Sequence, residues 1–391
     1  MLFNLSQFGQ PDIISTLISF AVLIVLFFFA PRLMMIQSVL KLEKDVIELE
    51  NMAVRSKSFV IKYVSKKSTS QANSQINSFM EFFSIPPVEA DPYGIIKKLD
   101  YILKQSDNRF TYFVNQIAPK MSNDEKKNLK NALAGAITTY QLAKVVRHFL
   151  EIIKKYKMFQ LAMILQMQIP LIVRVSNAAM HATKAFTEGV PIGDAIGCMV
   201  AANLLRGKHK LFREEEFVLG KGKVRGREVW ISKADGPGAS TGYPGKFLQK
   251  VLKKNKINRI ITVDAGMKLE GEKAGSIAEG VGVAIGGSGV DRYEIEEIAV
   301  KRNIPMDAVI IKVSDEEALM PMKKEVLNSV PNALKAVESA VMRGRRNEKI
   351  LIMGIGNTCG VGNSFASIRE SEERLKKYHK RQEEEKLKKK K

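Results

Sequence analysis

The stretch KILIMGIGNTCGVGNSF, Lys349 to Phe365, decides the fold class of this chain. Residues 350–353 are suited to a buried strand, and a turn containing Gly354 and Gly356 follows directly. A strand that opens into a glycine-rich turn is typical of an α/β domain in which the backbone approaches a ligand. A dinucleotide site would also need a second strand with an acidic residue further on. Only a charged segment follows, so we do not expect an NAD site.

The sequence before this stretch alternates predicted strands with predicted helices. EFVLGKGKVRGREVWIS predicts a hairpin, and INRIITVDAG and MDAVIIKVS predict buried strands, the first of which ends at Asp264. Helices are predicted for PGKFLQKVLKKN, VDRYEIEEIAVKRN and residues 323–343. This alternation predicts a mainly parallel sheet covered on both faces, in an α/β domain over residues 191–370. Ligands of such sheets bind beyond the carboxyl ends of strands, here the turns after Ser232, Val263 and Met353.

The apolar run from Ile13 to Ala30 predicts a membrane anchor over residues 1–36. As a helix that rises about 1.5 Å per residue, its 18 residues cover ~27 Å, close to the hydrocarbon thickness of a bilayer. Residues 1–11 contain no Lys or Arg, whereas Arg32 follows the run, which places the N-terminus outside and the body in the cytoplasm. A cleaved signal peptide would need basic residues before the run. We therefore expect a single-pass protein of the cell membrane with lipid as a partner.

The segment after the anchor, residues 37–85, begins with a seven-residue repeat. Val39, Val46, Ala53 and Val60 recur every seven residues, with Leu at two positions between them. This spacing is typical of a parallel two-stranded coiled coil and predicts a homodimer through this helix. One amphipathic helix packed on its own body explains the pattern equally well. Residues 65–78 are polar and are interpreted as a linker.

Residues 86–190 are predicted to form a helical domain. The sequence from Ser122 to Glu125 has the spacing of a capping box, so a long helix is expected to start there. A second helix is expected from about Met158 to Phe186, with a kink at Pro170. Its apolar part, residues 159–173, is interrupted by Gln residues, and we interpret it as a soluble core helix rather than a second span.

The charge of the chain favours anionic partners. Lys and Arg number 62 against 41 Asp and Glu, which gives a net charge of +21 and favours a membrane surface or nucleic acid. Aromatic residues make up 7% and Trp230 is the only tryptophan, so nucleic acid is possible but not favoured. Cys198 and Cys359 match no zinc spacing. Residues 371–391 are interpreted as a charged tail that is dispensable for folding.

Two further segments contain candidate site residues. In PIGDAIGCMVAANLL, Gly193 and Asp194 open a helix that also contains Gly197; read alone, Asp194 is a helix cap. In EGVGVAIGGSGVDR, Gly286 and Gly287 precede a predicted helix whose N-terminus could bind an anion. The alternative for this second segment is a strand of small residues packed closely under a helix.

Read together, DAIGCMVA, VDA and GIGN resemble the motif set of the hydrogenase-maturation and spore-germination peptidases, an α/β fold. In that family the GxGN turn precedes the acidic helix start, so the order here would be circularly permuted. The resemblance assigns the two acidic positions to Asp194 and Asp264, and the turn to Asn357. The metal-ligating His of the maturation enzymes has no counterpart between Asp264 and the tail, so metal and cofactor are left open. The anchor, the helical region and the segments GVPIGDAIG, VDAGMKLEGEKAGSIAEGVGVAIGGSGV and GIGNTCGVGN together make the whole chain resemble an uncharacterised archaeal family of single-pass membrane-anchored proteins.

We therefore expect a polar cleft that is hydrolase-like or binds a small anion. The alternative is a non-enzymatic, membrane-tethered scaffold whose basic surface binds nucleic acid or anionic lipid. The expected catalytic residues are Asp194, Asp264 and Asn357. The expected ligand-binding residues are Gly193, Gly197, Lys268, Glu270, Glu272, Gly286, Gly287, Gly354 and Gly356.

Overall fold

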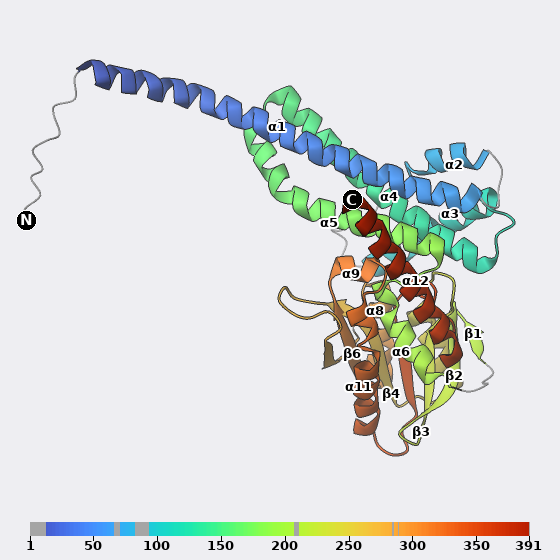
Figure 1. Cartoon of the computed structure of the whole chain (residues 1–391). Coiled ribbons are helices and arrows are strands. Elements are labelled where there is room, and N and C mark those ends of the chain that lie inside the picture. Colours follow the sequence, from blue (N-terminus) through green and yellow to red (C-terminus); the bar gives the residue numbers. More distant parts are fainter. Residues whose placement is uncertain are drawn as a thin grey trace, which may run out of the picture. The chain divides into compact units, whose positions relative to one another are not determined.

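A computed structural model describes residues 13–65, 71–82, 94–206, 211–283, 285–287 and 289–390 (Figure 1). Contacts divide the chain into two compact units, residues 1–51 with 141–174 and residues 52–140 with 175–391. Residues 1–11, on which the predicted topology rests, lie outside the described part. Part of the predicted linker also lies outside the described residues. Another part of it forms helix α2 (Gln71–Phe79), where the sequence analysis expected an irregular segment.

The first unit is built from parts of three long helices, α1 (Ile13–Ser65), α4 (Asn123–Tyr156) and α5 (Phe159–Glu188). Leu42, Val46 and Leu49 of the seven-residue repeat are fully buried. Ion pairs beside them join α1 to α4: Arg147 binds Glu50 at 2.8 Å, and Lys154 binds Glu43 at 2.9 Å. The apolar seam of α1 is therefore covered by helices of the same chain, as the amphipathic-helix interpretation predicts.

Two helices among the described residues are long and apolar enough to cross a membrane, a test that core helices of soluble proteins also pass. The apolar window of α1 has a mean hydropathy of 2.4 and contains no buried residue. The window of α5 has a mean hydropathy of 1.4 and is 22% buried. The core-helix prediction for residues 159–173 is thus wrong for most of the segment. Only one narrow face, with Ala162, Leu165 and Ile169, is buried, while Met163 and Met167 are exposed.

The helical part of the second unit contains α2, α3 (Ile95–Ile117) and the first turns of α4. The capping box predicted at the start of α4 is present: the Glu125 backbone N–H donates to Ser122 Oγ, and Glu125 Oε2 accepts from the Ser122 backbone N–H at 3.0 Å. Phe79 stacks on Phe113 with ring centroids 3.9 Å apart, which fixes α2 against α3.

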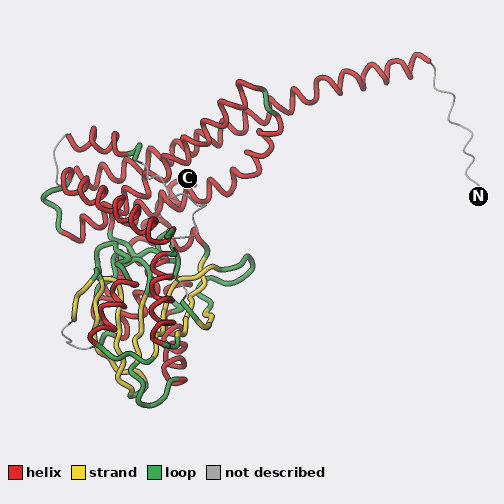
Figure 2. Tube along the Cα trace, turned by 180° about the vertical axis from the view of Figure 1, so that it is seen from behind, coloured by secondary structure: helices red, strands yellow, loops and turns green. Residues whose placement is uncertain are grey.

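The described residues of the second unit include a seven-stranded sheet of order β1-β2-β3-β7-β4-β6-β5 (Figure 2). The centre, β3-β7-β4-β6, is parallel, whereas β1, β2 and β5 pair antiparallel at the two edges. The sheet is therefore mixed, and the prediction of a mainly parallel sheet holds for its centre. The strands are β1 (Phe212–Glu214), β2 (Phe217–Val224), β3 (Arg227–Ala234), β4 (Arg259–Met267), β5 (Ile277–Val281), β6 (Met306–Val313) and β7 (Ile350–Gly354).

Helices cover both faces of this sheet. The crossovers β3 to β4 through α7 (Pro244–Lys254) and β6 to β7 through α11 (Val330–Arg343) run in opposite directions along the sheet. Since parallel crossovers are right-handed, these helices lie on opposite faces. Helix α8 (Val290–Arg302) packs on α7, and α6 (Ile196–Leu204), preceded by the short helix η1 (Gly193–Ala195), packs on α11 and on the central strands.

The predicted helix over residues 323–343 is divided in two. Helix α10 (Lys324–Leu327) ends shortly before α11 begins, and α9 (Asp315–Leu319) precedes both. The break falls just before Pro331, which has no backbone N–H to donate to the Leu327 carbonyl and is tolerated only in the first turn of a helix, here α11.

The charged tail differs from its prediction. Helix α12 (Phe365–Lys390) buries Ile368, Leu375 and Tyr378, and packs on α6. Ser371 Oγ donates to the Gly360 carbonyl at 2.7 Å. The prediction rested on the run EEEKLKKKK, which forms only the last turns. The first half of the segment has apolar residues at helical spacing and belongs to the core of the second unit.

Candidate functional site

The carboxyl ends of β3, β7 and β4 lie side by side at one edge of the sheet. Strand β7 is inserted between β3 and β4 although it comes last in the chain. The chain leaves β3 toward α7 on one face of the sheet, whereas it leaves β7 toward α12 (Phe365–Lys390), which packs on α6 and so lies on the opposite face with α11. In open α/β sheets this arrangement is the topological switch point, where ligands bind beyond the strand ends.

The start of α6 lies directly against this edge. A Cβ added to Gly197 would lie 2.3 Å from the carbonyl oxygens of both Val263 and Ile355, so only glycine allows the helix to approach the ends of β4 and β7. At Gly356, where φ is +111°, a Cβ would lie 2.0 Å from the Asp194 carbonyl oxygen. Three segments that are distant in sequence therefore meet, as the sequence analysis expected.

This close packing changes the interpretation of the glycines. Beside Gly193 a Cβ would meet the Glu317 carbonyl oxygen at 2.1 Å, and beside Gly354 it would meet the Ala201 side chain and the Gly197 carbonyl oxygen at 2.5 Å. The space next to these glycines is occupied by the chain itself. They hold α6 against the strand ends, rather than leaving room for a ligand.

Asp194 and Asp264 both belong to this meeting point. Asp194 Oδ2 accepts a hydrogen bond from the Asn357 backbone N–H at 2.7 Å. Asp264 Oδ1 accepts from the Ala265 backbone N–H at 2.7 Å, and the Gly286 backbone N–H also donates to this carboxyl group. Asp264 is only 3% exposed, whereas Asp194 is half-buried. Each acid is thus held by backbone donors, and Asp194 is the one that solvent reaches.

Both carboxyl groups have raised pKa values, and the charge of Asp194 contributes to the shift of Asp264. Burial raises the pKa of Asp264 well above its ordinary value, and the charge of Asp194 raises it further. Burial also raises the pKa of Asp194, opposed by the hydrogen bond from the Asn357 backbone. Neighbouring carboxyls with this behaviour retain a proton that an isolated aspartate would have lost, which is the property needed for general acid–base chemistry.

A buried lysine, missed by the sequence analysis, lies at the end of the adjacent strand β3. Lys233 is fully buried, and its Nζ donates to the Ala234 carbonyl at 2.7 Å and to Asn363 Oδ1 at 2.8 Å. Burial lowers its pKa to about 8. Cys198, whose pKa burial raises to about 12, interacts electrostatically with Lys233, Asp194 and Asp264. A lysine at the end of an apolar strand, directly before a glycine-rich loop, was the available signal.

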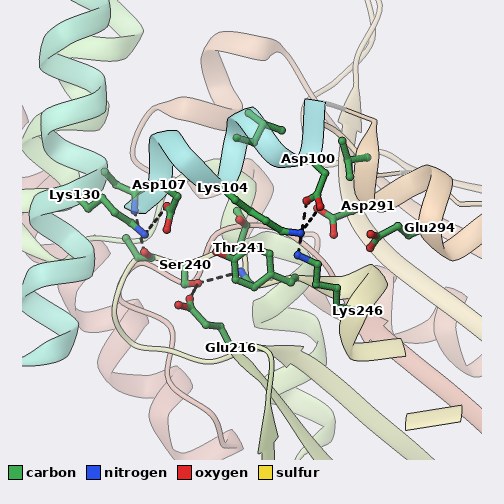
Figure 3. A pocket seen from close by; sticks show the side chains of 16 residues that line it. Asp100, Lys104, Asp107, Lys130, Glu216, Ser240, Thr241, Lys246, Asp291 and Glu294 are labelled. Atoms are coloured by element: carbon green, nitrogen blue, oxygen red, sulfur yellow. Dashed lines mark hydrogen bonds and ion pairs between the residues drawn. The ribbon is translucent and has the colours of Figure 1, made fainter. Parts of the chain in front are cut away.

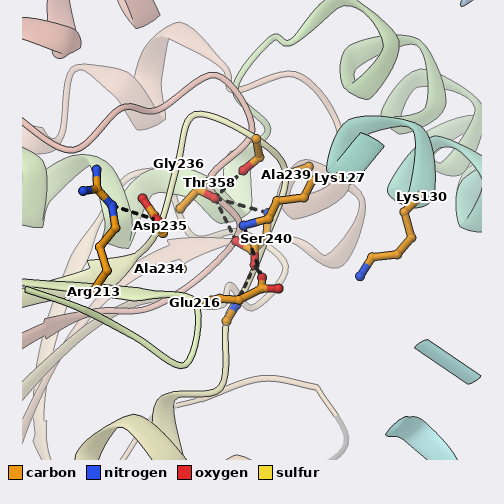
Figure 4. Close-up of polar contacts among 12 residues, drawn as sticks. Lys127, Lys130, Arg213, Glu216, Ala234, Asp235, Gly236, Ala239, Ser240 and Thr358 are labelled. Carbon is orange, nitrogen blue, oxygen red and sulfur yellow. Dashed lines mark hydrogen bonds and ion pairs between the residues drawn. The ribbon is translucent and has the colours of Figure 1, made fainter. Parts of the chain in front are cut away.

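The loop between β3 and α7 is fastened to the turn after β7 (Figure 4). Thr358 Oγ1 donates to the Gly238 carbonyl at 2.6 Å and accepts from the Ser240 backbone N–H at 3.2 Å. Ser240 Oγ donates in turn to Glu216 Oε2 at 2.5 Å. The turn that holds Asn357 beside Asp194 therefore also positions the β3–α7 loop.

That loop forms one wall of a polar cavity of 260 Å³ (Figure 3). Helices α3, α7 and α8 contribute Lys104, Lys246 and Asp291 respectively. Lys104 pairs with Asp100 and is hydrogen-bonded to Lys246, whose Nζ lies 3.7 Å from Asp100 Oδ1. Burial and the neighbouring Lys104 lower the pKa of Lys246, and burial raises the pKa of Asp291. The sequence analysis missed this cavity, because its residues come from helices that no single motif connects.

Three further expected ligand residues, on the segment that follows β4, are ion-paired or exposed. Lys268 Nζ binds Glu317 at 3.3 Å, Glu272 pairs with Lys312, and Glu270 is exposed. The predicted inclusion of these three side chains in one cleft with Asp194 and Asp264 finds no support in their contacts. Gly287 has no atom within 4 Å of an added Cβ, so the loop that contains Gly286 is open on that side. Within the described ranges no group of three His, Cys, Asp or Glu residues could hold a metal ion.

These features define the C-terminal portion as an α/β domain with two acidic residues, Asp194 and Asp264, at its topological switch point. A family model described as "Domain of unknown function (DUF1512) C-terminal" matches residues 192–362. A second, described as "Protein of unknown function (DUF1512) N-terminal domain", matches residues 16–189. The chain belongs to the DUF1512 family. No curated protein matches it.

Proposed function

We propose that the carboxyl edge of the sheet is a hydrolase-like acid–base site in a protein anchored to the membrane. The observation that carries this proposal is the meeting of Asp194 and Asp264, which lie 70 residues apart in sequence, with both pKa values raised. In this proposal Asp264 keeps its proton and acts as the general acid. The half-buried Asp194 takes a proton from an attacking water. Such groups typically contribute about 10²- to 10⁴-fold to a rate.

The arrangement around the acids supports the resemblance to the hydrogenase-maturation and spore-germination peptidases. The turn containing Asn357, the helix start at Asp194 and the strand end at Asp264 are the three matched segments, and they are neighbours here. The order of these segments along the chain would then be circularly permuted. A peptide or another acyl compound is the substrate class that this resemblance favours.

The test compares variants at the acid pair with a charge-matched control. Purified full-length protein would be screened against peptide, ester and phosphoester substrates between pH 5 and pH 8. We expect hydrolysis of one class, reduced at least 10²-fold in Asp194→Asn and in Asp264→Asn. Glu228→Gln, which removes the same charge from an exposed position of β3, should retain activity. Hydrolysis unchanged by both Asp variants, or absent from all three substrate classes, would refute the proposal.

The cavity supports a second candidate, the binding of a small anion. Lys104 and Lys246 place two amino groups side by side, and the N-terminus of α7 lies in the same wall. The negative charge of a bound phosphate or carboxylate would offset the repulsion between the two lysine amino groups. It would also interact favourably with the dipole of α7. Thermal stabilisation by inorganic phosphate that is lost in Lys104→Met tests this role. Equal stabilisation of both proteins by phosphate would exclude it.

We also propose a single-pass topology, with α1 in the cell membrane, the N-terminus outside and the body in the cytoplasm. Its support is the exposed apolar window of α1 and the basic residues that follow it. A fusion of alkaline phosphatase to the C-terminus should be inactive, and a fusion of green fluorescent protein should fluoresce. The opposite pair of results would reverse the topology.

If neither the acid pair nor the cavity has the proposed activity, the scaffold hypothesis replaces them. In that case the net charge of +21 would bind nucleic acid or anionic lipid, and binding would weaken steeply with added salt.

A further inference from the structure

The hairpin formed by the end of α4 and the start of α5 carries an apolar surface with no covering element in the described part of its unit. Large apolar side chains on α5 are exposed: Met158, Met163, Ile164, Met167 and Leu171. Met167 is 75% exposed, although soluble surfaces rarely gather side chains of this kind. Since 163, 167 and 171 are four residues apart, they lie along one side of the helix.

Contacts with α1 show where along α1, relative to its apolar run, this surface lies. Gln166 Nε2 donates to the Ser38 carbonyl at 3.3 Å, so Met163 and Met167, one turn or less away, are beside this part of α1. Lys154, just before the hairpin turn, binds Glu43 at 2.9 Å. Ser38 follows the apolar run by eight residues, or about 12 Å of helix. The exposed apolar residues of α1 continue to Ile36, however, so Ser38 lies only two residues, about 3 Å of helix, beyond them, which is within a headgroup layer of roughly 5–8 Å.

The chemistry of the hairpin turn fits the same place. Tyr156 is exposed, and Lys155 Nζ lies 5.1 Å from the centre of its ring. Lys157 follows and is also exposed. Tyr at the headgroup level, with lysines whose stems run along apolar surface and whose amino groups reach anionic lipid, is the usual composition of a membrane interface.

The lipid surface is favoured over a second copy of the chain as the covering partner. The exposed surface of α5 is level with Leu33, Met34 and Ile36, the exposed apolar residues that continue the span of α1. A protein partner would have to cover this continuous surface while excluding lipid from it. The flanking lysines complement the negative charge of phospholipid headgroups and attract the hairpin to an anionic surface.

We propose that the α4–α5 hairpin, residues 154–171, inserts its apolar side chains into the interface of the membrane that α1 spans. The hairpin is thus a second, peripheral attachment that rests on the proposed anchor and fixes the rotation of the unit about α1. It takes anionic phospholipid as its ligand. The 22% burial of the apolar window of α5 follows from this role, because the remaining residues contact lipid rather than protein.

The test uses the full chain reconstituted in vesicles. Met163→Cys is labelled with the environment-sensitive fluorophore NBD, and Val145→Cys is the matched control. These side chains are 49% and 52% exposed and lie in the same unit. Cys198 and Cys359 are buried, so the unsubstituted chain should take up little label. Lipids carrying a nitroxide near the headgroup report contact with the bilayer.

We expect several-fold stronger nitroxide quenching and a blue-shifted emission at position 163, with little quenching at position 145. The difference should increase when phosphatidylglycerol is added to phosphatidylcholine vesicles. Equal weak quenching at both positions would overturn the proposal. A blue shift at position 163 without lipid quenching would overturn it in favour of a second copy of the chain. Flotation of the protein with the vesicles tests the anchor separately: if the chain does not float, the proposed anchor fails, whatever the label reports.

Discussion

Replacing Asp264 with Asn should remove a pH dependence from the stability of this protein. The carboxyl group is 3% exposed, and its pKa is raised well above the ordinary value by burial and by Asp194. Between the unfolded and folded pKa values, the folded state holds a proton that the unfolded state has released. Stability contributed by this group is therefore complete below about pH 4 and is lost as the pH rises toward the folded pKa.

The size of the effect follows from the same linkage. Each pH unit between the folded and unfolded pKa corresponds to about 1.4 kcal/mol. Asn keeps an oxygen that can accept the hydrogen bonds from the backbone N–H groups of Ala265 and Gly286, and it is neutral throughout. Going from pH 4.5 to pH 7.5, we expect Asp264→Asn to gain more than about 1 kcal/mol of unfolding free energy relative to the wild type.

The assay is urea denaturation followed by circular dichroism, at several pH values and in one detergent. Glu228→Gln is the control, because it removes a carboxylate from an exposed position of the neighbouring strand β3. Any constant cost of the new amide cancels when the two pH values are compared. If wild type and Asp264→Asn change in parallel with pH while both remain folded, Asp264 is not a protonated buried acid and the reasoning is wrong.

Three further predictions concern the free energy of unfolding of the same unit, measured by thermal or chemical denaturation. Gly356→Ala should cost more than about 2 kcal/mol, because its φ is +111° and the new Cβ collides with backbone. Gly271→Ala, with a φ of +89° but open space around it, should cost only about 1–2 kcal/mol, and equal losses would contradict the packing described. Leu375→Ala, at 1% exposure, should cost about 2–5 kcal/mol, whereas deletion of residues 382–391 should cost under about 0.5 kcal/mol. A loss under about 0.5 kcal/mol for both changes would restore the dispensable-tail prediction. Between about pH 8 and pH 10.5, burial of Lys233 makes stability rise with pH, and Lys233→Met should abolish this rise; a rise that persists would show that the amine is not buried.

Much of the architecture could be predicted because it depends on local signals. Alternating apolar strands and amphipathic helices indicated the central strands, and the capping box at Ser122 gave the start of α4. The insertion of β7 between β3 and β4 could not be read from the sequence, since the pairing of distant strands is decided by packing of the whole sheet. The predicted hairpin is confirmed as the antiparallel pair β2–β3, whereas the antiparallel edge strands β1 and β5 were missed.

The acid pair was accessible to sequence analysis, whereas most of its surroundings were not. Asp194 and Asp264 each stand next to small residues at the end of an element, and those small residues are what permits the close approach. Lys233 was missed because a lysine at the end of a strand is ordinarily solvated, and only the fold shows that Asn363 and the Ala234 carbonyl cover it. Lys268, Glu270 and Glu272 were grouped with the acids because they follow β4 closely. Lys268 and Glu272 are held in ion pairs and Glu270 is exposed, so their contacts give this grouping no support.

The most direct test of the acid pair is a carbon NMR titration of the aspartate carboxyl groups. Protein labelled at aspartate Cγ would be titrated, with resonances assigned through Asp194→Asn and Asp264→Asn. Two carboxyls should titrate above the ordinary aspartate range of about 4, and Asp194→Asn should lower the pKa of Asp264 by removing its charged neighbour. If Asp264 titrates near 4, or if its pKa is the same with and without Asp194, the two acids do not form a coupled pair and the proposed acid–base site is contradicted.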